Sequence, residues 1–149
     1  MAIARKRGLN VVHLDQLHHL PHTDWRPHPA HEFHALHDEA IDHDQWVIEG
    51  NYSACMPQRL LRATGVILLD VSMPVSLFRY LRRALFEHDR VGALAGNRDS
   101  VKWDMLHHIA VVTPRNRRRY AELYRQLSLP KIYLSSMHEL RNCYREWQL

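Results

Sequence analysis

Short apolar runs alternate along the chain with longer segments of mixed polarity. Four of these runs, each containing valine, isoleucine or both, predict strands at Asn10–Leu14, Trp46–Glu49, Gly65–Asp70 and Lys131–Leu134. Strands that are apolar on both faces are typical of parallel sheets covered by crossover helices. The pattern therefore predicts an α/β fold, with a parallel sheet flanked by helices.

Helical periodicity fills the segments between the predicted strands. It predicts helices over His31–Asp44, Pro57–Arg62, Val75–His88, Val101–Val112, Pro114–Leu127 and Met137–Trp147. A shorter helix, MAIARKR, precedes the first strand, and Gly8 stands where helices commonly end in a left-handed residue.

Two segments between these elements are expected to be loops. Leu20–Ala30 contains three prolines, and Arg90–Ser100 contains two glycines and two arginines. The second loop, lying between two predicted helices, is either a candidate lid around residues 88–112 or an ordinary surface connection.

Length and composition limit the number of domains and the compartment. A chain of 149 residues, with 46% hydrophobic and 24% charged residues, fits one globular domain over residues 1–149. No apolar run approaches the roughly 18 residues of a membrane span, and no export signal opens the chain. We therefore expect a cytoplasmic protein without a membrane partner, in which Cys55 and Cys143 are reduced thiols.

The net charge indicates an anionic ligand without selecting one. Lysines and arginines exceed acidic residues by four, and the isoelectric point is about 9.3. Nucleotides, nucleic acids and acidic protein surfaces are all compatible with this balance, as is a merely solubilising surface.

Polar side chains follow three of the predicted strands. Asp15 follows the first strand, Glu49-Gly50-Asn51-Tyr52 the second and Asp70 the third. Ligands of open parallel sheets bind beyond the carboxyl ends of the strands, so these groups are expected to converge. Acidic groups there could hold Mg²⁺ through its waters or accept a proton from a substrate hydroxyl. Taken singly, each residue also fits a helix cap or a turn.

Arginines cluster at helical spacing after the third strand. Arg79, Arg82 and Arg83 are three or four residues apart and could direct guanidinium groups to one phosphate chain. In the later run Arg115, Arg117, Arg118 and Arg119, Arg115 shares a helix face with Arg118 or Arg119. Phosphoryl transfer needs such positive charge, although a solvated face or a nucleic-acid contact is the alternative.

Several motifs together resemble one known family. They are His13-Leu14-Asp15 with Leu17, Trp25 with Pro27, Glu32-Phe33, the segment WVIEGNYS from Trp46 to Ser53, Arg59-Leu60 and Leu69-Asp70. With these motifs the chain resembles the adenylate-kinase-like P-loop proteins called DNA topology modulation (FlaR-like) proteins, over nearly its whole length. The WVIEGNYS segment is the most diagnostic, and Glu49 stands where members typically carry Asp.

The resemblance implies a three-layer P-loop-kinase-like fold that uses ATP and Mg²⁺. In that family a first, central strand and a G-x-x-x-x-G-K-[ST] loop come directly before the helix that reads MAIARKR here. This sequence contains neither. Either an upstream region is missing from the given sequence or the chain is a degenerate member, and we favour the first explanation.

The resemblance also suggests roles for individual residues. Asp15 is expected to contact the acceptor hydroxyl or the Mg²⁺ shell, Gly50, Asn51, Tyr52 and Arg59 to bind the acceptor, and Arg79 and Arg83 to clamp the transferred phosphate. Arg82, Arg115 and Arg119 are further candidate phosphate contacts, and Asp70 is a candidate second-shell group for Mg²⁺. The expected function is phosphate transfer from ATP to a small nucleotide-like or hydroxyl acceptor. The alternative is a catalytically inert nucleic-acid-binding module.

Histidines are concentrated in the first third of the chain. Nine of the thirteen lie between His13 and His43, and His31, His34 and His37 recur every three residues. Adjacent pairs on a helix could chelate a metal ion, but a polar helix face explains the spacing better because no third ligand accompanies them. His18 and His19 could instead contact a substrate.

Overall fold

The computed structural model describes residues 1–86, 103 and 113–149, apart from the side chains of residues 79, 83–86 and 113–115. Contacts within the chain divide it into two units, which are described separately. Within the described residues, no helix combines the length and apolar character that crossing a bilayer requires.

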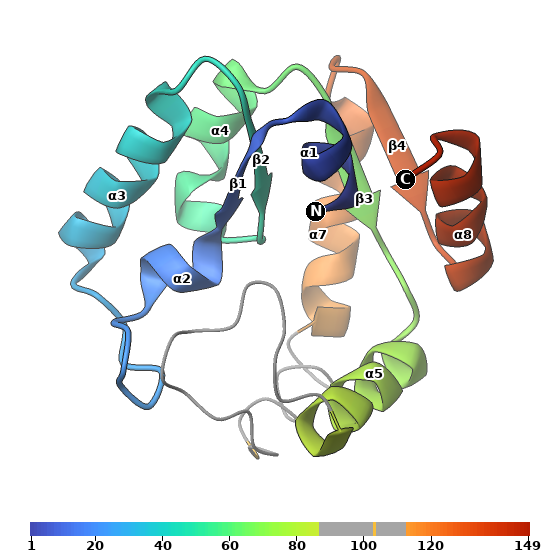
Figure 1. Cartoon of the computed structure of the whole chain (residues 1–149), viewed down its shortest axis with the longest axis horizontal. Coiled ribbons are helices and arrows are strands. Elements are labelled where there is room, and N and C mark those ends of the chain that lie inside the picture. Colours follow the sequence, from blue (N-terminus) through green and yellow to red (C-terminus); the bar gives the residue numbers. More distant parts are fainter. Residues whose placement is uncertain (87–102, 104–112) are drawn as a thin grey trace. The chain divides into compact units, whose positions relative to one another are not determined.

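The first unit is built around a pair of parallel strands, β1 (Asn10–His13) and β2 (Trp46–Glu49) (Figure 1). In their register Asn10 lies opposite Trp46 and His13 opposite Glu49, so the two strands end side by side. The helices of this unit are α1 (Ala2–Arg7), α2 (Leu14–His18), α3 (Ala30–Asp42) and α4 (Met56–Arg62), with a 3-10 turn η1 (Ser53–Cys55) before α4.

Most of the buried apolar residues of the described chain lie in this first unit. They are Ala4, Leu14, Phe33, Ile41 and Cys55, whereas the second unit contributes Leu134. Helix α3 contacts both α2 and α4 and buries Phe33, His37 and Ile41 along one side, at the spacing of a helix face. The buried apolar side chains of this unit thus come from α1, α2, α3 and η1.

The second unit contains the other parallel pair, β3 (Val66–Leu69) and β4 (Lys131–Leu134). Its helices are α5 (Met73–Phe86), α7 (Thr113–Gln126) and α8 (Met137–Glu146), of which α8 contacts β4 (Figure 1). The first residue of β4 fastens the end of α7, because the Lys131 ammonium donates to the main-chain oxygens of Tyr124, Arg125 and Leu127 at 2.7–2.9 Å. These carbonyls lie at or just beyond the end of the helix, where carbonyls lack helical partners.

The elements lie close to their predicted positions. β2 and β4 have the predicted bounds, and the ends of the predicted helices in the described residues agree within two residues. Gly8 has φ 64° and ends α1 as a left-handed residue, as predicted. The five-residue helix α2 was not predicted. The predicted helix Val101–Val112 and the candidate lid lie outside the described residues, except for Trp103.

The strands form two separate two-stranded sheets among the described residues, in the orders β1-β2 and β3-β4. Both pairs are parallel, in accordance with the sequence. A three-layer fold with one parallel sheet flanked by helices remains a prediction, as does a single domain over residues 1–149.

Candidate functional site

The carboxyl ends of β1 and β2 bring two of the predicted residues together. Asp15 follows β1 in the first turn of α2, and Tyr52 follows β2 beyond Gly50 and Asn51. The Tyr52 hydroxyl donates a hydrogen bond of 2.7 Å to Asp15 Oδ1, across 37 residues of sequence. The Asp15 side chain is exposed, and each carboxylate oxygen can accept more than one hydrogen bond.

The phenol of Tyr52 is held as a proton donor. Burial raises its pKa well above the usual range, and the hydrogen bond to the Asp15 carboxylate raises it further. Tyr52 therefore stays protonated at neutral pH and keeps donating to Asp15.

Aromatic rings pack beside this pair. The His18 ring lies 4.6 Å from the Tyr52 ring and 4.9 Å from the Phe33 ring, measured between centroids. Burial lowers the pKa of His18, and the neighbouring His19 lowers it further, against an opposing effect of Asp15. The lowered pKa favours the uncharged form of the His18 ring.

Gly50 shapes the turn that follows β2. Its φ is 122°, a conformation that residues with a side chain rarely adopt, and Leu14 lies against it. The lack of a side chain at Gly50 lets Leu14 approach the backbone closely, while Gly50 and Asn51 are both exposed to solvent.

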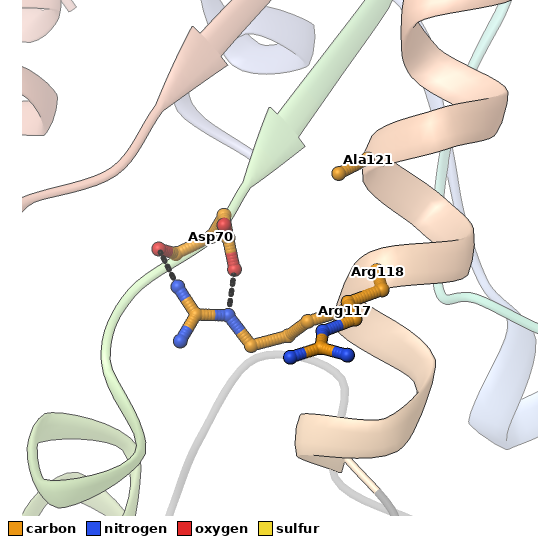
Figure 2. A pocket seen from close by; sticks show the side chains of 4 residues that line it. All are labelled: Asp70, Arg117, Arg118 and Ala121. Atoms are coloured by element: carbon orange, nitrogen blue, oxygen red, sulfur yellow. Dashed lines mark hydrogen bonds and ion pairs between the residues drawn. The ribbon is translucent and has the colours of Figure 1, made fainter.

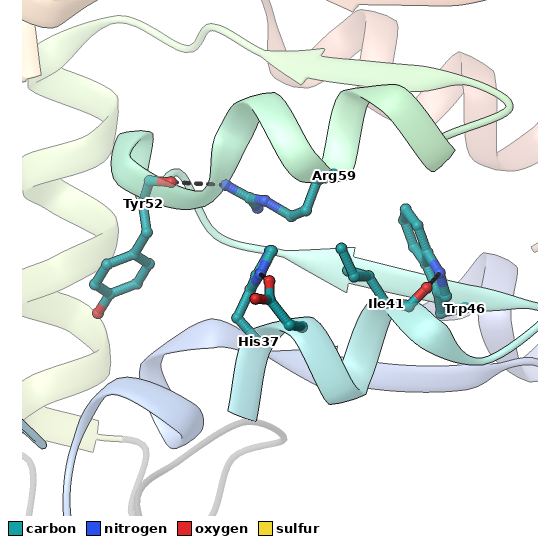
Figure 3. A network of polar contacts seen from close by, with 6 residues as sticks. His37, Ile41, Trp46, Tyr52 and Arg59 are labelled. Atoms are coloured by element: carbon teal, nitrogen blue, oxygen red, sulfur yellow. Dashed lines mark hydrogen bonds and ion pairs between the residues drawn. The ribbon is translucent and has the colours of Figure 1, made fainter. Parts of the chain in front are cut away.

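Arg59 is directed into the protein and supports the loop after β2. It is 8% exposed, and its Nη1 and Nη2 donate to the main-chain oxygens of Gly50 and Tyr52 at 3.0 and 2.9 Å. Figure 3 shows the Arg59 side chain extending from α4 toward the main-chain oxygen of Tyr52, with the His37 ring of α3 directed toward α4. The observed role of Arg59 is to position the loop, and its predicted contact with an acceptor remains a prediction.

His37 is the one member of the histidine series that is buried. It is 0% exposed and its Nδ1 lies 3.0 Å from Asp38 Oδ1, whereas His31 and His34 are exposed. Among the residues that the structure describes, no group of three or more His, Cys, Asp or Glu side chains is placed to hold a metal ion.

The third strand end lies in the second unit and forms a different network. Asp70 follows β3, and its two carboxylate oxygens accept hydrogen bonds from Arg117 Nε on α7 and from the Tyr133 hydroxyl on β4. The hydrogen bond from Arg117 holds the pKa of Asp70 below its usual value, with Tyr133 acting in the same direction and burial opposing both. A Mg²⁺-bound water would have to share an oxygen of Asp70 with one of these donors.

An open pocket of about 280 Å³ adjoins this network. It is lined by Asp70, Arg117, Arg118 and Ala121 (Figure 2). Arg117 reaches back to Asp70, and Arg118 extends from the same helix as an exposed side chain.

The remaining predicted arginines are only partly described. The side chains of Arg79, Arg83 and Arg115 lie outside the described residues, while Arg82 and Arg119 are exposed on α5 and α7. The predicted convergence of three strand ends is therefore observed for β1 and β2, which share a sheet, whereas Asp70 lies in the other unit.

Two partners of Asp70 were not predicted. Arg117 stood within the recognised arginine run but was not assigned to the face of Arg115, and Tyr133 carried no signal beyond strand propensity. Their pairing with Asp70 joins residues 47 and 63 positions apart. A contact at such separation leaves no trace in local spacing.

Comparison with known proteins does not identify a relative. The chain matches no family model, and neither a curated protein nor a solved structure shows significant similarity to it.

Proposed function

We propose that this chain is an adenylate-kinase-like phosphotransferase domain that transfers phosphate from ATP to a small nucleotide-like or hydroxyl acceptor. The observation that carries the proposal is the hydrogen bond between Tyr52 and Asp15 at the joint end of β1 and β2. Such an end is where open parallel sheets bind their ligands.

The Asp15 carboxylate is the group that would receive the acceptor's hydroxyl proton. A catalytic carboxylate must lie within hydrogen-bond reach of that proton, and the Asp15 side chain is exposed to solvent. Tyr52 holds Oδ1 of this carboxylate in place, and Arg59 fixes the main chain on either side of Asn51. The carboxylate and its support are thus positioned before an acceptor binds, which lowers the entropic cost of reaction.

ATP would supply the phosphoryl group, and Mg²⁺ would neutralise its developing charge. The loop that holds both in P-loop proteins is not part of this sequence. The described residues provide no cluster of metal ligands, and Asp70 is already bonded to Arg117 and Tyr133. We assign Asp15, Tyr52 and Arg59 to the acceptor half of the reaction.

Acceptor binding by the chain as given tests this assignment. Titration calorimetry with nucleosides, nucleoside monophosphates and small alcohols should reveal an acceptor whose affinity falls about tenfold in Asp15→Asn, since one charge-assisted hydrogen bond is lost. Asp42→Asn, an exposed carboxylate on α3, is the matched control and should bind normally. Circular dichroism would verify that both variants fold.

A transfer assay addresses the reaction itself. A version carrying a G-x-x-x-x-G-K-[ST] strand and loop upstream should transfer the γ-phosphate of ATP to the bound acceptor, and Asp15→Asn should abolish most of the transfer. Absence of turnover with every acceptor class, or equal turnover in Asp15→Asn, would contradict the proposal.

A second candidate is a catalytically inert nucleic-acid-binding module. It is favoured by the exposed arginines Arg118 and Arg119 on α7 beside the open pocket. Binding to DNA or RNA should then weaken steeply as salt rises, because lysines and arginines displace counterions from phosphates. Binding that is absent, or insensitive to salt, would exclude this candidate.

A further inference from the structure

Asp15 and Tyr52, at the ends of β1 and β2, present hydrogen-bond acceptors. The Tyr52 hydroxyl donates its one hydrogen bond to Asp15, and the ionised Asp15 side chain carries only acceptor oxygens. A ligand that meets Asp15 and Tyr52 must therefore bring its own donors.

Two neighbouring histidines lie beside this pair. His19 Nδ1 lies 2.9 Å from the main-chain oxygen of Asp15, which can only accept, so His19 donates there. His19 Nε2 lies 3.2 Å from His18 Nδ1, so a proton on one of these two nitrogens joins the rings.

Carboxylates stand at both strand ends. Asp15 follows β1, and Glu49 ends β2 as an exposed side chain opposite His13, whose Nδ1 lies 4.0 Å from Glu49 Oε1. Arg59 is buried, and two of its nitrogens donate to main-chain carbonyls of the loop. A phosphate group placed beside Asp15 would meet like charge from that carboxylate.

The neighbouring rings favour a ligand with a flat body. Tyr52 and His18 are partly exposed and tilted by 32° to one another, with Phe33 buried behind them. Aromatic surfaces of this kind stack on bases and sugars without requiring a charge.

We propose that the acceptor bound beside Asp15 and Tyr52 is an uncharged nucleoside, recognised through its hydroxyl groups and base, rather than a nucleoside monophosphate. This inference rests on the proposed function and narrows its acceptor class. It also makes Glu49 a specificity-determining residue, because its carboxylate repels a phosphorylated ligand.

Matched pairs of ligands test the inference on the chain as given. Adenosine with AMP and thymidine with TMP are titrated by calorimetry at neutral pH, and the nucleoside of at least one pair should bind about tenfold more tightly than its monophosphate. Tighter binding of the monophosphate in each pair that binds would overturn the inference and leave the proposed function standing. If neither nucleosides, monophosphates nor small alcohols bind, the proposed function fails as well.

Glu49→Gln tests the charge of Glu49 through the ratio of nucleoside to monophosphate affinity, which a purely structural role would not change. The variant should bind the monophosphate about threefold more tightly than the parent protein does, with unchanged nucleoside affinity, because one repelling charge is removed. Glu39→Gln makes the same chemical change at an exposed position on α3 and should leave both affinities unaltered. An unchanged ratio of affinities in Glu49→Gln would refute the role of Glu49 in specificity.

Discussion

Leu14 packs so closely against Gly50 that the glycine has no room for a side chain. A Cβ placed at Gly50 would lie 2.9 Å from the Cβ of Leu14, which is itself 0% exposed. This contact joins the residue after β1 to the residue after β2, and so sets the spacing of the two strand ends.

Gly50→Ala should therefore destabilise the protein by about 3 kcal/mol, since it adds a steric clash to a strained backbone conformation. Gly8→Ala is the control, because Gly8 also has a positive φ but has open space around it. That variant should lose only about 1 kcal/mol from backbone strain. Urea unfolding of both variants measures the difference, and equal losses would show that the contact with Leu14 is unimportant.

Arg59→Met should cost about 2 kcal/mol of stability. Methionine fills part of the same space but leaves the carbonyls of Gly50 and Tyr52 without the two donors that Arg59 supplies. Arg62→Met, on the same helix, removes an exposed ion pair with Asp42 and should cost less than about 0.5 kcal/mol. Chemical denaturation ranks the two variants, and a similar cost for both would argue against a supporting role for Arg59.

Asp70 should make the free energy of unfolding depend on pH in the acidic range. Its folded pKa is lowered, chiefly by Arg117, so its stabilising contribution is present above the unfolded pKa of about 3.9 and is lost as pH falls through the lower folded value. Asp70→Asn should thus be less stable than the parent protein at pH 7, and the gap should narrow below about pH 4. Urea unfolding at a series of pH values measures the gap, and a gap that stays constant into acid would contradict this assignment.

Tyr52 and Asp15 should show energetic coupling. The single variants Tyr52→Phe and Asp15→Ala and the double variant form a cycle whose interaction energy should be about 1 kcal/mol, as expected for a hydrogen bond to a carboxylate that is exposed. Thermal or urea unfolding of the four proteins provides the values. Strictly additive losses would mean that the hydrogen bond does not persist in solution.

Local pattern was enough to locate the strands and most helices. β2 and β4 are short apolar runs with clear boundaries, and Gly8 signals the end of α1 through its conformational freedom. Helix α2 escaped prediction because five residues, Leu14–His18, are too few to show a helical period.

The sequence predicted which residues belong to the candidate site better than it predicted the contacts between them. Asp15 and Tyr52 were both selected, because each follows a strand of a predicted parallel sheet. The inward direction of Arg59 was not predicted, because it depends on the path of the loop after β2. The partners of Asp70 likewise depend on how α7 and β4 meet β3, which no short stretch of sequence encodes.

Lys131 couples local unfolding at the end of α7 to local unfolding at the start of β4. Because its ammonium donates to three carbonyls at the end of α7, fraying of that helix end and detachment of the start of β4 require the same bonds to break. The last turn of α7 should therefore resist hydrogen exchange for as long as β4 stays paired with β3, and acetylation of Lys131 should release both segments to exchange together.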